Sequence, residues 1–152
     1  MSGDFDFLVG RWDVANRRLV RRHVGGDDWD EFPGTSVAHR FFDGAGSFDE
    51  MTCPTRGFSG SSLRILDPAT GDWSIYWMNS RRGVLEVPPM VGRFADGVGT
   101  FLADDTDEGR PIRCRFVWSG ITPTSCRWEQ AFSTDGERSW ETNWVMEFTR
   151  AG

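Results

Sequence analysis

The chain has 152 residues, a net charge of −6 at pH 7, eight Trp, twelve Phe and a single Tyr. Its negative field repels nucleic acids and anionic membrane surfaces, so neither is an expected partner. No apolar run is long enough for a transmembrane helix. The length fits one domain, which we expect to cover residues 1–152.

Residues 4–9 fit a single helical turn with Asp4 as its N-cap. The rest of the chain consists of short alternating segments separated by Gly, Pro and Asx turn residues, which is typical of an all-β fold. The predicted strands cover residues 11–22, 34–43, 47–53, 60–67, 72–79, 90–95, 98–104, 110–119, 125–133 and 139–150.

About ten consecutive strands joined by short turns form a meander. Closing such a meander into a barrel removes its exposed edges. We therefore expect an up-and-down antiparallel barrel of about ten strands, with a Greek-key sandwich as the alternative that turn spacing leaves open.

The last two strands predict the clearest register. Aromatic residues alternate along 125–133 and along 139–150, so one face of each must point inward. A three-residue loop at 135–137 would place Phe132 opposite Trp140, and Trp128 opposite Trp144.

The same alternation suggests polar groups inside the barrel. In the first strand, Asn16 and Arg18 share a face with Trp12. The remaining predicted inward polar residues are His39, Glu50, Asn79 and Gln130. A buried charge needs a partner. Arg18 would therefore pair with Glu50, meet a ligand carboxylate or face solvent in an open mouth.

The strand ends carry a resemblance. Gly10-Arg11-Trp12 opens the first long strand, and Arg150 ends the last one on the inward face. This resembles the calycin superfamily of lipocalins and fatty-acid-binding proteins. There, a Trp at the start of the barrel packs against an Arg from the final strand. The resemblance implies that Trp12 stacks on Arg150, a cation–π contact of about 0.5–2 kcal/mol.

Segments 5–14, 73–77, 128–133, 135–136, 140–141 and 148–150 are together similar to a bacterial family of calycin-like proteins of unknown function. This likeness spans the whole chain and implies a fold, with no catalytic residues to carry over. Residues 23–34 are too few for the helical lid of fatty-acid-binding proteins. The glycine-rich signature of the haem-binding nitrobindins is absent after Trp12.

These patterns favour a protein that binds a small hydrophobic or amphipathic molecule in the barrel. A small isomerase, cyclase or hydratase using His39 and Glu50 is the alternative from another class. A filled barrel acting as a structural or interaction module is the third. The candidate ligand-binding residues are Asn16, Arg18, His39, Glu50, Trp77, Asn79, Trp118, Trp128, Gln130 and Trp144.

Cofactors and metals are not expected. Two histidines without metal-ligand spacing give no zinc motif, and we expect no haem. Cys53, Cys114 and Cys126 are odd in number and far apart, which favours free thiols in a reducing cytoplasm. The acidic N-terminal residues lack the plan of a signal peptide. We expect a cytoplasmic monomer or homodimer.

Overall fold

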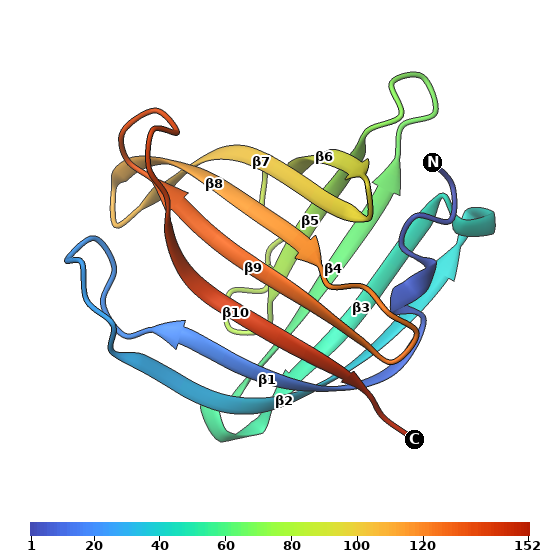
Figure 1. Ribbon diagram of the computed structural model, residues 1–152, viewed down its shortest axis with the longest axis horizontal. Coiled ribbons are helices and arrows are strands. Elements are labelled where there is room, and N and C mark those ends of the chain that lie inside the picture. Colours follow the sequence, from blue (N-terminus) through green and yellow to red (C-terminus); the bar gives the residue numbers. More distant parts are fainter.

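The computed structural model describes all 152 residues and shows a closed antiparallel β-barrel (Figure 1). Its ten strands follow chain order around the barrel, and the last pairs with the first, so the all-β, up-and-down prediction is confirmed. None of its helical segments has the length and apolar character needed to cross a membrane. The strands are β1 (Gly10–Leu19), β2 (Trp29–Phe41), β3 (Gly46–Cys53), β4 (Phe58–Leu66), β5 (Trp73–Asn79), β6 (Met90–Ala95), β7 (Val98–Asp107), β8 (Arg110–Ser119), β9 (Ser125–Ser133) and β10 (Glu141–Arg150).

The helical segments are three short 3-10 turns: η1 (Asp6–Leu8), η2 (Phe42–Gly44) and η3 (Pro54–Arg56). Nine of the strands begin and end close to their predicted positions. The exception is β2, which begins at Trp29 because Pro33 does not break it. Pro33 pairs with Ala15 of β1 and precedes the start of the β2–β3 ladder at Thr35. A proline is tolerated where a strand has only one neighbour.

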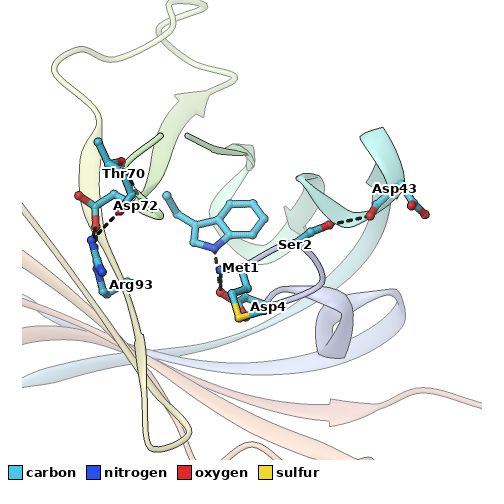
Figure 2. A network of polar contacts seen from close by, with 8 residues as sticks. Met1, Ser2, Asp4, Asp43, Thr70, Asp72 and Arg93 are labelled. Atoms are coloured by element: carbon cyan, nitrogen blue, oxygen red, sulfur yellow. Dashed lines mark hydrogen bonds and ion pairs between the residues drawn. The ribbon is translucent and has the colours of Figure 1, made fainter. Parts of the chain in front are cut away.

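The N-terminal segment closes one end of the barrel. Phe5 is 2% exposed, and its ring meets that of Trp73 edge-on at 4.9 Å between centroids. Asp4 accepts a hydrogen bond from Trp73 Nε1 at 3.1 Å, and Ser2 Oγ donates to the Asp43 carbonyl (Figure 2). The buried Phe5 ring and the hydrogen bonds of Ser2 and Asp4 together fix this segment, which we call the N-terminal plug.

The predicted contact between Trp12 and Arg150 is confirmed. The guanidinium carbon of Arg150 lies 4.0 Å from the centre of the Trp12 ring, and the two residues are partners in the β1–β10 ladder. Arg150 also donates to the carbonyls of Val9, Phe7 and Pro123. One side chain therefore ties the closing strand to η1 and to the β8–β9 turn.

The predicted register of β9 and β10 is wrong by one residue near the turn, where Phe132 lies opposite Glu141, and by two residues beyond the bulge. Trp128 lies opposite Met146, and Trp144 lies opposite Gln130. The connection spans residues 134–140 rather than three residues, and the pairing shifts between Thr142 and Trp144, where Asn143 is extra. A bulge of this kind moves the register while leaving the residues beyond it on their predicted faces.

The predicted facing of β2 and β3 is also wrong. His39 and Glu50 are exposed on the outside of the barrel, whereas Ser36, Asp49 and Met51 face inward. A one-residue change of facing moves every side chain of a strand to the other side. The outward residues of this region are more apolar than the inward ones, so hydrophobicity indicated the wrong face.

Candidate ligand cavity

A cavity of about 80 Å³ lies inside the barrel between two unlike walls. The first wall is aromatic and comes mainly from β5, β8, β9 and β10. The second is polar and comes from β2, β3 and β4. The aromatic lining consists of Trp77, Phe116, Trp118, Trp128, Trp144 and Phe148, and the polar lining of the second wall consists of Ser36, Asp49, Ser62 and Arg64.

The aromatic wall is built from rings that meet edge to face. The centroids of Trp128 and Trp144 are 5.7 Å apart with ring planes at 86°, and Phe116 lies 5.0 Å from Trp128. Trp77 meets Trp144 at 6.3 Å and 86°. Such pairs contribute about 0.5–1.5 kcal/mol each beyond their burial, so the wall is held in one arrangement.

The polar wall centres on a buried ion pair. Arg64 is 2% exposed and donates through Nη2 to Asp49 and through Nη1 to Ser47 Oγ at 3.1 Å. Asp49 also accepts from the backbone N–H of Ser62. The Arg64 guanidinium lies 5.0 Å from the centre of the Phe5 ring, so the pair stands directly above the N-terminal plug.

One hydrogen-bond donor of this pair remains unused. Arg64 Nε is buried and has no partner within the protein. An unmatched buried donor costs about 1–3 kcal/mol, more when the group is charged. Arg64 lines the cavity although its Nε atom is fully buried, so the polar wall presents the rest of a charged guanidinium group to the cavity.

Two amides support the aromatic wall. Asn16 is 2% exposed, and its Oδ1 accepts a hydrogen bond from Trp144 Nε1 at 3.0 Å. Gln130 lines the cavity and donates through Nε2 to Asn143 Oδ1 at 2.8 Å. The β10 bulge therefore brings the buried Asn143 to a residue of the cavity wall, while Asn16 fixes the orientation of one indole.

Arg18 lies near the end of β1, beyond Trp144. Its guanidinium carbon is 5.0–5.5 Å from the ring centres of Phe32, Phe58 and Trp144. Partial burial lowers the pKa of Arg18, opposed by the charge of Asp30. Arg56 binds both carboxylate oxygens of Asp30, and no carboxylate pairs with Arg18 itself.

The structure brings together half of the predicted site residues. Trp77, Trp118, Trp128, Gln130 and Trp144 line the cavity. Asn16 lies behind Trp144 and Arg18 beyond it, so both support the site without lining it.

Three predicted residues do not belong to the cavity. Asn79 ends β5, where its side chain accepts a hydrogen bond from the Arg81 backbone and stabilises the following turn. His39 stacks on Phe48 outside the barrel, with centroids 4.9 Å apart. Glu50 lies opposite Val37 on the same outer face, so neither His39 nor Glu50 can act in the cavity.

Sequence analysis missed the polar wall. Asp49, Ser62 and Arg64 sit beside apolar neighbours such as Phe48, Leu63 and Ile65, which seemed better suited to the interior. The one available indication was the placement of Phe58, Gly60, Ser62 and Arg64 on one parity. A buried Phe58 then carries Arg64 inward with it.

The structure contains no group of three or more His, Cys, Asp or Glu side chains able to hold a metal ion. The three cysteines are free and buried. Burial raises the pKa of Cys126 to about 12 and raises the pKa of Cys53 and Cys114 as well. A thiol attacks as its thiolate, so none of them is an activated nucleophile near neutral pH.

No known protein-family model matches the chain, and no curated protein is significantly similar to it. The class of protein therefore rests on the architecture itself. A closed ten-stranded up-and-down antiparallel barrel is compatible with a calycin-like fold.

Proposed function

We propose that this protein binds one small molecule with a planar apolar body and a hydrogen-bond acceptor at one edge. The observation that carries the proposal is the contrast between the two cavity walls. Trp77, Trp128 and Trp144 offer ring faces and edges to an apolar body. On the opposite wall Ser36 and Ser62 offer hydroxyl groups to the acceptor, beside the charged Arg64. Mostly apolar pockets with a few placed polar groups are typical of ligand sites.

The cavity limits the size of the ligand. One water needs about 10–15 Å³ of such space, so 80 Å³ holds a group of about five to eight non-hydrogen atoms. Drug-sized ligands occupy pockets of about 300–1,000 Å³. A single ring with one polar substituent fits this range, and a long acyl chain does not.

Arg18 suggests how such a molecule enters. The Phe58 ring contacts both the Arg18 guanidinium and the Trp144 ring, and Trp144 lines the cavity. A guanidinium without a carboxylate partner in a chain of net charge −6 offers local attraction to an acidic or polar substituent. Residue Arg18 would then act at the entrance and Arg64 at the bottom of the site.

A pair of adjacent serines tests the site. Ser62→Leu fills the cavity from the polar wall, while Ser61→Leu adds the same side chain to the outside of the same strand. Phenol, benzoate, indole and toluene are titrated against intrinsic Trp fluorescence, with calorimetry as the second readout. We expect at least one compound to bind the wild type and Ser61→Leu, and to lose at least about tenfold in affinity with Ser62→Leu.

Unfolding curves of both variants confirm that each is folded before binding is compared. Equal loss of binding in the two variants, or no response of the wild type to any compound, contradicts a ligand site in this cavity. The filled-barrel module then becomes the better description.

The calycin-like family is part of the proposal. Its support is the closure of the barrel by Trp12 and Arg150 together with the strand order. The three free cysteines support a reducing, cytoplasmic location. The enzyme alternative loses its basis, because His39 and Glu50 lie on the outer face.

A further inference from the structure

The end of the barrel opposite the N-terminal plug, which we call the mouth, carries three guanidinium groups around two aromatic rings. β1 runs from the plug to this end and brings Arg18 there (Figure 1). The Phe58 ring centre lies 5.5 Å from the guanidinium carbon of Arg18 and 6.0 Å from that of Arg81. Arg56 lies 5.1 Å from the centre of the Phe32 ring, and the centres of Phe32 and Phe58 are 6.3 Å apart. We call these three residues the arginine cluster.

Two members of the arginine cluster have no acidic partner in the protein. Both carboxylate oxygens of Asp30 are bound by Arg56. Arg81 donates to the backbone carbonyl of Arg56, and Arg18 forms no ion pair. Asp28 is exposed and pairs with none of the three. The mouth therefore holds uncompensated positive charge in a chain whose net charge is −6, which favours an anion from outside the protein.

Arg18 connects the arginine cluster with the cavity. It lies on the inward side of β1, and its guanidinium carbon is 5.0 Å from the centre of the Trp144 ring, which lines the cavity. Partial burial removes water from this guanidinium and lowers the pKa of Arg18. Arginine nevertheless stays protonated near neutral pH. A partly desolvated cation gains more from an anion than a fully hydrated one does, because the local dielectric constant is lower.

The other end of the cavity suits a neutral group. Arg64 is bound to Asp49, so the pair as a whole carries no net charge. A carboxylate placed there would meet the charge of Asp49 as well as that of Arg64. Ser36 and Ser62 offer hydroxyl groups beside this pair, and a hydroxyl both donates and accepts hydrogen bonds. The two ends of the cavity therefore favour different substituents, a neutral polar one near the plug and a negative one at the mouth.

The size of the cavity agrees with this division. A phenol ring fits a space of about 80 Å³, and a carboxyl group attached to that ring would lie beyond the cavity, toward the mouth. The parallel N–H donors of a guanidinium match the two oxygens of a carboxylate. We propose that the ligand is a single-ring aromatic carboxylate, with its ring in the cavity and its carboxylate bound by Arg18. The proposal rests on the ligand site proposed above and adds the charge and the orientation of its ligand.

Two matched ligands test the charge. Para-hydroxybenzoate and para-hydroxybenzamide have nearly the same shape, and only the first is an anion at pH 7. Calorimetry should show that the wild type binds the carboxylate at least about tenfold more tightly than the amide. Added salt should weaken binding of the carboxylate and leave binding of the amide nearly unchanged.

Two matched variants locate the charge. Arg18→Met keeps an apolar side chain among the rings but removes the cation, so both ligands should bind with similar affinity. Arg17→Met is the control, because Arg17 is the next residue on β1 and its guanidinium lies 5.0 Å from the Trp29 ring on the outer face. It should keep the preference for the carboxylate. Arg18→Lys retains the charge without the paired donors and should show an intermediate preference.

The outcomes separate this proposal from the ligand site itself. If the wild type binds both compounds equally and Ser62→Leu abolishes both, the cavity site stands and the proposed charge of its ligand is wrong. A preference for the carboxylate that survives in Arg18→Met also overturns the proposal. If no aromatic compound binds the wild type, the ligand site and this proposal fail together. Urea unfolding confirms that each variant is folded, and Arg18→Gln serves as a second uncharged variant.

Discussion

The two long walls of the barrel distribute polarity in opposite ways. Along β8 to β10 the outer face carries ion pairs such as Arg127 with Glu129 and Glu147, and the inner face is aromatic. Along β3 and β4 the inner face carries Arg64 and Asp49, and the outer face carries Phe48, Leu63 and Ile65 among polar residues. The charged outer face of the first wall is solvated directly by water. The second keeps an ion pair inside the barrel.

The largest expected effect tests the inner charges of the β3–β4 wall. Arg64→Met leaves Asp49 buried without its partner, and we expect the free energy of unfolding to fall by about 3–5 kcal/mol. Arg127→Met removes a partly exposed arginine from the other wall and should cost about 1 kcal/mol or less. Urea unfolding followed by circular dichroism measures both.

A double variant sharpens the same comparison. Arg64→Met with Asp49→Leu leaves no uncompensated charge inside, so most of the lost stability should return. If Arg64→Met costs no more than Arg127→Met, the pair is solvated and the two walls are alike after all.

The next effect concerns the β1–β10 ladder, the seam that closes the barrel. Arg150→Ala removes the stacking on Trp12 and three hydrogen bonds to carbonyls, and should cost about 2 kcal/mol. Arg150→Lys keeps the charge but lacks the planar guanidinium group with its several donors, so its free energy of unfolding should lie between those of the wild type and Arg150→Ala. An unchanged melting midpoint for Arg150→Ala would count against a calycin-like closure.

A smaller effect is expected at Asp107, the last residue of β7. Hydrogen bonds from Arg22, and secondly from His23, hold the pKa of Asp107 below its usual value. A carboxyl with a lowered folded pKa stabilises the protein above its unfolded pKa of about 4, and this contribution disappears as the pH falls through the folded pKa.

Asp107→Asn should therefore lower stability by about 1 kcal/mol at pH 7 and make little difference well below pH 4. Thermal unfolding of the wild type and the variant across this pH range measures the difference. A gap between them that persists unchanged at the acid end would exclude this carboxyl as its source.

The smallest effect is expected at Phe48, on the outer face of β3. Phe48→Ser should change the free energy of unfolding by less than about 0.5 kcal/mol, because the side chain is already exposed. Phe101→Ala, which empties a fully buried position, should cost about 3–5 kcal/mol. Similar costs at the two positions would show that Phe48 belongs to the core and that the β3 face is not free.

The comparison also explains what the sequence could predict. Turn residues and alternation located the ten strands, and Trp12 with Arg150 predicted the closure. On β8 to β10 the apolar residues face inward, so Trp118, Trp128 and Trp144 were placed correctly. The register was not, because the Asn143 bulge has no simple mark in the sequence.

On β2 and β3 hydrophobicity indicated the wrong face. Phe48, Leu63 and Ile65 look like core residues in the sequence, although they face outward. The polar wall of the cavity was therefore missed together with Asp49 and Arg64. Periodicity distinguishes the two faces of a strand but does not say which of them points inward.

The pairing of β1 with β10 has a consequence for how the chain folds. Every other ladder joins strands that are neighbours in sequence, so these ladders can form one after another with short loops. The β1–β10 seam alone must bring together the two ends of nearly the whole chain, which costs more loop-closure entropy. We expect this step to set the folding rate. Arg150 stabilises the β1–β10 ladder. Its contacts should therefore slow the opening of the barrel, while the rates at which the single hairpins form should hardly depend on it.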